Sequence, residues 1–244
     1  MSRAAIYVVG DKFATFGAND GVVTVSDLLT GIEQGDFAGE SGQGTHFRLG
    51  QGLHHEQIQM LVAAAESRQI LQSFDRKIRD GRDTCAKRGE VHKHRPENVL
   101  ITSPRRIADD VFESDLVIDD RCELMNDHVT GQHVQGMVLI EAARQMFLAV
   151  TEAFFVDPES GHHYYFVINE MNTEFRRFLF PVEAIVRYRI IESDVTDPGR
   201  LSFTAAIDVM QADRSTTTVN VRFTAFDAEV IERKEAEKAR QTIE

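Results

Sequence analysis

The residues best suited to chemistry lie where a glycine-containing turn runs into a helical pattern. His128 and His133 fall in the turn, and Glu141, Arg144 and Gln145 fall in the first turns of the helix. Histidine can carry protons near neutral pH, and a carboxylate near the N-terminus of a helix can assist general acid–base catalysis. Glu141 and Arg144 are three positions apart, so their side chains can touch.

The start of this helix is a second candidate for binding. Backbone N–H groups in the first turn, around Gly136 and Met137, have no acceptor within the helix and point out of its end. We call this N-terminal end of the helix, around Gly136 and Met137, the helix mouth. It is a suitable place for a carbonyl oxygen or a phosphate.

A structural interpretation of the same residues stays open. Glu141 and Arg144 would then form an internal ion pair, Gln145 would hydrogen-bond the backbone of a strand, and His133 would cap a turn. The other histidines have no helical i, i+4 partner and no nearby cysteine, so we expect neither a metal site nor a cofactor; they include His54-His55, His92, His94 and His162-His163.

The elements that must position these residues follow from periodicity. From Gly136 to Phe154 the helix is apolar around most of its circumference, which predicts that it is buried. Downstream, apolar and polar residues alternate in three runs, 182–190, 201–209 and 219–223, joined by short turns that include Asp197-Pro198-Gly199. These runs predict an antiparallel meander, and shorter strand-like stretches at 99–102 and 111–118 precede the helix.

A buried helix followed by long antiparallel strands predicts an α+β fold in which one curved sheet wraps around one central helix, the hotdog arrangement. We place this domain at residues 91–230, after an N-terminal region at 1–90 and before a charged helix at 231–244. An open sheet leaves an exposed edge, so we expect a homodimer.

The N-terminal region is harder to interpret. A short strand at 5–9 and a helix after a Ser26 cap precede seven glycines between Gly31 and Gly52, which predict a long irregular loop. A helical pattern then runs from His55 to about Ile78.

Composition limits the function classes. The 244 residues carry a net charge of −12, which argues against broad binding of nucleic acid. We interpret the basic cluster between Arg76 and Arg95 as a solvated helix end and linker. No long apolar run indicates a membrane span or a leader, and Cys85 and Cys122 make no disulfide framework, so the expected location is the cytoplasm.

The central stretch resembles the signature of the A-factor biosynthesis hotdog family, bacterial enzymes associated with γ-butyrolactone autoregulators. The matching residues are Asp127-His128, His133, Gly136-Met137 and Glu141-Ala142-Ala143-Arg144-Gln145. Residues 91–93 and 98–101 resemble the opening of that domain, and 175–178 with Pro181 resemble the strand that follows the helix in hotdog dehydratases. Some members carry two hotdog repeats; this chain shows one, so the second copy is expected from another subunit.

The resemblance implies transfer of a β-ketoacyl group from an acyl carrier protein or coenzyme A thioester to a hydroxyl of a small phosphorylated acceptor such as glycerone phosphate. Glu141 would act as general base or orient the acceptor, and Arg144 would pair with it or hold an anionic group. The N–H groups near Gly136 and Met137 would stabilise the oxyanion.

Under the same resemblance, His128 or His133 would shuttle the proton, Gln145 would complete the substrate-binding set, and Arg176 and Arg177 would contact a phosphate or form a solvated strand face. Two other function classes remain open at this point: a dehydratase or thioesterase acting on an acyl thioester, and a non-catalytic binding or partner subunit.

Overall fold

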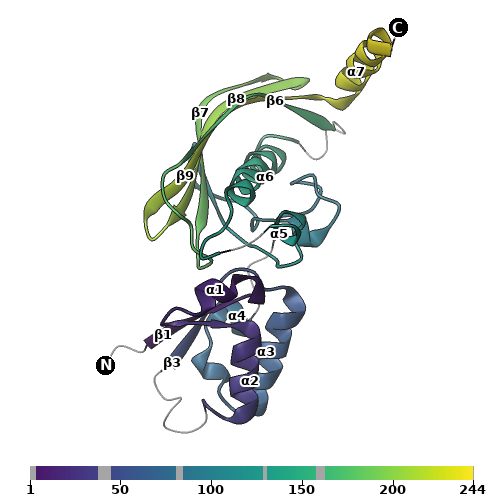
Figure 1. Cartoon of the computed structure of the whole chain (residues 1–244). Coiled ribbons are helices and arrows are strands. Elements are labelled where there is room, and N and C mark those ends of the chain that lie inside the picture. Colours follow the sequence, from purple (N-terminus) through teal and green to yellow (C-terminus); the bar gives the residue numbers. More distant parts are fainter. Residues whose placement is uncertain (1–3, 38–44, 81–84, 129–130, 158–162, 244) are drawn as a thin grey trace.

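A computed structural model describes residues 4–37, 45–80, 85–128, 131–157 and 163–243. The chain forms two units, a small N-terminal one and a larger one in which a curved sheet surrounds a helix (Figure 1). Within the described residues, no helix is long and apolar enough to cross a membrane.

The N-terminal unit is built on a parallel sheet. Strands β1 (Ala4–Val9), β2 (Val22–Thr24) and β3 (Thr45–Leu49) lie in the order β2-β1-β3. Their buried side chains pack with those of helices α2 (Val25–Gln34), α3 (His55–Ser67) and α4 (Arg76–Arg79) in one apolar cluster. A short helix, α1 (Ala14–Gly17), and two 3₁₀ turns, η1 (Asp11–Phe13) and η3 (Leu71–Ser73), complete the unit.

Three expectations for this unit need correction. The glycine-rich stretch is not one long loop, because α2 and β3 lie within it; residues 38–44 are outside the described range. The cap of α2 is Thr24, whose side chain accepts the N–H of Asp27, and not Ser26. The helical pattern from His55 ends at Ser67, where Gln69 adopts a φ of 58°, a left-handed conformation that breaks a helix.

The larger unit has a six-stranded antiparallel sheet in the order β4-β5-β7-β8-β9-β6. Its strands are β4 (Arg105–Ala108), β5 (Val111–Asp115), β6 (Tyr164–Phe175), β7 (Ile185–Asp197), β8 (Arg200–Gln211) and β9 (Arg214–Asp227). The predicted meander is the β7-β8-β9 part of this sheet. The stretch at 99–102 forms isolated bridges, such as Ile101 with Leu116, in place of the predicted strand. A 3₁₀ turn, η4 (Pro96–Asn98), comes just before it.

Helix α6 (Gly136–Phe154) lies in the hollow of this sheet (Figure 1). Most of its apolar side chains are buried, and Phe147 stacks on Phe223 of β9 with ring centroids 4.4 Å apart. The prediction of a buried central helix is therefore confirmed, and the α+β hotdog architecture with it. Helix α7 (Ala228–Ile243) follows β9 and extends away from the sheet.

The two units are joined by buried backbone and amide contacts. The side chain of Gln51 donates to the carbonyl of Leu116 at 3.0 Å and accepts the N–H of Ile118 at 2.9 Å. The N–H of Gly52 donates to the carbonyl of Ile118. A Cβ on Gly10 would lie 1.6 Å from the carbonyl oxygen of Gly52, so only glycine fits where these loops meet. These contacts fix the N-terminal unit against the end of the hotdog domain.

Candidate functional site

The site begins at the N-terminus of α6, which short contacts hold in place. The Gln135 side chain donates to the carbonyl of Leu124 in helix α5 (Glu123–Asn126), and the N–H of Val134 donates to the carbonyl of Leu179 at 2.8 Å. The N–H of Val138 is satisfied by the carbonyl of Gln135 at 3.2 Å. Among the described residues, the N–H groups of Gly136 and Met137 have no hydrogen-bond acceptor, as expected for the first positions of a helix.

Aromatic side chains surround this helix start. The ring of Phe175, at the end of β6, lies so close to Gly136 that a Cβ there would be 2.7 Å from it. Phe178 packs on the imidazole of His133, with centroids 4.6 Å apart. Phe175, Phe178 and Met137 are all more than half exposed. The helix mouth is thus an open, largely apolar surface with two backbone donors in it.

Glu141 stands one turn and a half further along α6, at the centre of an ionic network. Its carboxylate accepts hydrogen bonds from Arg144 Nε at 2.8 Å, Arg144 Nη2 at 2.9 Å and Gln145 Nε2 at 3.0 Å. The ammonium of Lys93 lies 2.8 Å from Glu141 Oε1. The ion pair expected between Glu141 and Arg144 is present, and Lys93 adds a second cation that the helix pattern does not reveal.

The network sets the charge of Glu141. Burial alone would raise its pKa, but the hydrogen bonds from Arg144 and Lys93 outweigh burial and hold the pKa below its ordinary value. Glu141 is therefore an ionised carboxylate at neutral pH, with both oxygens already accepting hydrogen bonds. This arrangement fits the role of positioning cations more closely than the role of a general base that removes a proton.

Gln145 connects the network to the chain that covers the helix. Its side chain is completely buried, accepts the N–H of Leu100 at 2.8 Å and donates to the carbonyl of Asn98 at 2.8 Å. The partner is the irregular segment around η4 and not a ladder strand, so the backbone bond expected for Gln145 exists but not to a strand of the sheet. Gln145 is buried behind Glu141 and holds that segment in place.

The two histidines of the motif lie in different surroundings. His133 is exposed, three residues before the start of α6, and packs on Phe178. His128 is exposed as well and borders residues 129–130, which are outside the described range. His133 lies at the helix mouth, because it stands three residues before α6 and contacts Phe178.

Arg176 and Arg177 follow the end of β6 and do not lie within a strand, because β6 ends at Phe175. The resemblance of this stretch to a strand therefore holds only for its first residue. Arg176 pairs with Glu174 at 2.7 Å, and Arg177 donates to the carbonyl of Ser215 at 2.8 Å. Both side chains are exposed and bonded to nearby surface groups, so the structure does not bring them to Glu141.

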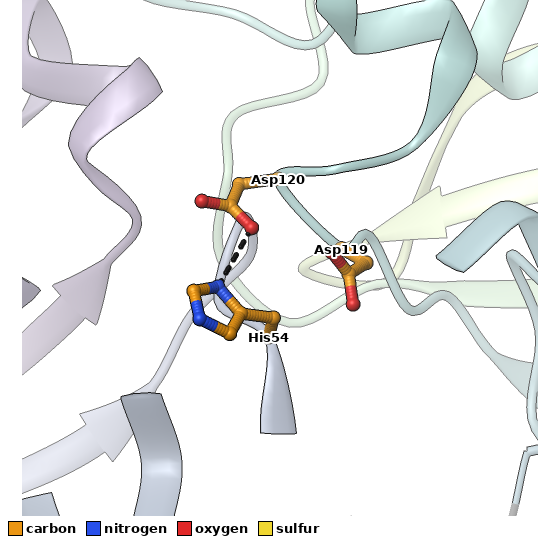
Figure 2. A group of neighbouring side chains, drawn as sticks. All are labelled: His54, Asp119 and Asp120. Carbon is orange, nitrogen blue, oxygen red and sulfur yellow. Dashed lines mark hydrogen bonds and ion pairs between the residues drawn. The ribbon is translucent and has the colours of Figure 1, made fainter. Parts of the chain in front are cut away.

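A separate group of potential metal ligands lies at the junction of the two units (Figure 2). His54, Asp119 and Asp120 each offer one ligand atom, all within 4.8 Å of one another. These atoms are already used: His54 Nδ1 is 2.9 Å from Asp120 Oδ1, and Asp119 is held by the guanidinium of Arg121 at 3.1 Å. His54 also caps the positive end of α3, which disfavours a cation. The group therefore acts as a clamp between the units.

The comparison with known proteins points to one family. Residues 75–227 match the A-factor biosynthesis hotdog domain. No curated protein shows significant sequence similarity to the chain.

Solved structures of similar architecture include a mutant thioesterase from Pseudomonas aeruginosa, with 16% identity, a TM-score of 0.38 and coverage of 52% of this chain and 81% of that one. A conserved protein from the same organism has 20% identity and a TM-score of 0.36, covering 51% and 87%. A thioesterase from Haemophilus influenzae has 15% identity and a TM-score of 0.35, covering 51% and 77%.

The family match begins before Val91, where the resemblance in sequence begins, and so includes α4 and the basic segment that carries Lys93. It ends at Asp227, the last residue of β9, and spans more than half of the chain. The protein is a member of the A-factor biosynthesis hotdog domain family.

Proposed function

We propose that the chain is an acyltransferase of secondary metabolism that moves a β-ketoacyl group from an acyl thioester to a hydroxyl of a small phosphorylated acceptor of the glycerone phosphate type. The observation that carries the proposal is the open start of α6. Two backbone N–H groups without an acceptor among the described residues, at Gly136 and Met137, face a surface that an acyl chain can cover. Donors of this kind stabilise the oxyanion of acyl transfer.

The reaction is a direct transfer, because the stretch 127–145 holds no serine or cysteine to form an acyl-enzyme. The acceptor hydroxyl attacks the thioester carbonyl carbon, and its proton passes to His133. The carbonyl oxygen becomes an oxyanion that accepts hydrogen bonds from Gly136 and Met137. The tetrahedral intermediate then collapses, the C–S bond breaks, and the leaving sulfur takes the proton from His133.

Glu141 and Arg144 support this chemistry from behind the helix mouth. Because the pKa of Glu141 is lowered, Glu141 stays a carboxylate that fixes Arg144 and Lys93. We assign it the role of orienting these cations. Arg144 remains partly exposed, so it is placed to attract an anionic part of a substrate.

A β-ketoacyl thioester of N-acetylcysteamine, supplied with and without glycerone phosphate, tests the activity. Release of free thiol that depends on the acceptor supports acyl transfer. Release in water alone would instead make the protein a thioesterase. Loss of water from the corresponding β-hydroxyacyl thioester, without release of thiol, would make it a dehydratase, and binding without turnover would make it a binding subunit. Replacing His133 by Ala should lower turnover by about 10²- to 10⁴-fold, whereas His55→Ala on α3, also exposed, should leave it unchanged.

The functional form is a homodimer joined through β6. This strand is an edge of the sheet, so its outer N–H and C=O groups face no neighbouring strand among the described residues. It also exposes Tyr165, Ile168 and Phe175. Pairing with a second β6 would continue the sheet and cover the apolar rim of the helix mouth.

Light scattering on the purified protein measures this assembly. Ile168→Asp should convert the dimer to a monomer, while Ile107→Asp, at a similarly exposed position on the opposite edge strand β4, should not. A wild-type monomer, or dissociation by the β4 substitution alone, would exclude this interface.

A further inference from the structure

A basic pocket adjoins the ionic network of α6. It has a volume of about 700 Å³ and is lined by the segment that covers the helix, with Lys87, Arg88, Lys93 and His94 among its walls. No carboxylate is among its described lining residues. This local excess of positive charge stands out in a protein whose net charge is −12.

The ion pairs that reach the pocket leave positive charge over. Lys87 is matched by Glu90 at 3.0 Å, but Lys93 shares the single carboxylate of Glu141 with Arg144. In the described structure, Arg88 pairs with no carboxylate, since its Nη1 donates to the neutral carbonyl of His94 at 2.7 Å. Arg88 therefore supplies one positive charge, and Lys93 and Arg144, which share one carboxylate, supply another. An anionic ligand can neutralise this charge.

We propose that this pocket binds the phosphate of the pantetheine arm that carries the acyl thioester, an inference that rests on the proposed function. Arginine and lysine side chains bind phosphate through charge-assisted hydrogen bonds. Lys93 belongs both to the pocket and to the Glu141 network, so it connects the phosphate site to α6.

The distance from the Glu141 network to the start of α6 favours the thioester donor, and not the acceptor, as the source of the bound phosphate. Glu141 is five residues into α6, which places it about 7.5 Å along the axis from the helix start at 1.5 Å per residue. A glycerone phosphate molecule has its phosphate only a few bonds from its hydroxyl, and that hydroxyl must meet the thioester at the helix mouth. The pantetheine arm separates phosphate from sulfur by a much longer chain, which spans this distance.

The test compares thioesters that contain the phosphate with one that lacks it. The double variant Lys87→Ala/Arg88→Ala should raise KM for a β-ketoacyl-coenzyme A and for the same acyl group on a carrier protein about tenfold or more. It should leave kcat nearly unchanged, and leave both constants unchanged for the N-acetylcysteamine thioester. Arg233→Ala/Lys234→Ala on α7 removes the same charge from exposed positions and serves as the matched control.

Equilibrium binding separates failure of the pocket from failure of the proposed activity. By calorimetry, 4′-phosphopantetheine should bind the wild-type protein more tightly than pantetheine, and the double variant should remove that difference even if no thioester turns over. Equal binding of the two compounds, an equal loss in the α7 control, or an increase in KM for the phosphorylated acceptor alone would overturn the assignment.

Discussion

Replacing Glu141 by Gln removes the one carboxylate that two cations share. Breaking a buried ion pair by deleting one partner costs about 3–5 kcal/mol, and the Glu141 side chain is 18% exposed, so we expect a loss of about 2–4 kcal/mol near pH 7. The free energy of unfolding in urea, followed by circular dichroism, measures this loss. The control is Glu123→Gln, which breaks an exposed ion pair with Arg95. Because the Glu123 side chain is 60% exposed, this loss should cost less than about 1 kcal/mol.

The pH dependence of this stability loss tests whether the charge of Glu141 is its cause. Because folding lowers the pKa of Glu141, its stabilising contribution is complete above the ordinary pKa of the unfolded chain, and it is lost as the pH falls through the lower folded value. The difference between wild type and Glu141→Gln should thus stay constant from about pH 7 to about pH 5.5 and shrink at lower pH. A difference below about 1 kcal/mol, or one that does not change on acidification, would refute the ionic account of this network.

Three further outcomes follow from single contacts. The hydroxyl of Tyr188 is buried with no partner among the described residues, so Tyr188→Phe should stabilise the fold by about 1 kcal/mol in urea unfolding, and a loss of that size would show a missed hydrogen bond. His54→Ala should cost about 1–2 kcal/mol by loss of its bond to Asp120, whereas a chelator should leave the melting temperature unchanged; a fall of several degrees would show a bound metal. Gly136→Ala puts a methyl group 2.7 Å from the Phe175 ring and should lower turnover, with Phe175→Ala restoring it; full turnover in the single variant would place the chemistry elsewhere.

Much of the hotdog domain is visible in its periodicity. The helix from Gly136 to Phe154 is apolar on nearly every side, and the strands of the meander alternate, because each packs one face on that helix. The N-terminal sheet is not visible in this way. Strand β2 has three residues and β3 has five beside a run of glycines, so neither is long enough to show a pattern.

The candidate site is predictable only where its residues share one helix. The spacing of Glu141 and Arg144 gives their pairing directly. Lys93 lies in a charged, irregular segment, and only the fold brings its ammonium to Glu141. Similarly, β6 places Phe175 against Gly136, and the rest of α6 and most of β6 separate these two residues in the sequence.

Mass spectrometry of the acceptor tests the central claim most directly. Wild-type protein incubated with a β-ketoacyl thioester and glycerone phosphate should yield an acceptor heavier by one acyl group, together with an equal amount of free thiol. The yield should fall in His133→Ala and persist in His55→Ala. Thiol release with no acylated acceptor at any acceptor concentration would contradict acyl transfer at the start of α6.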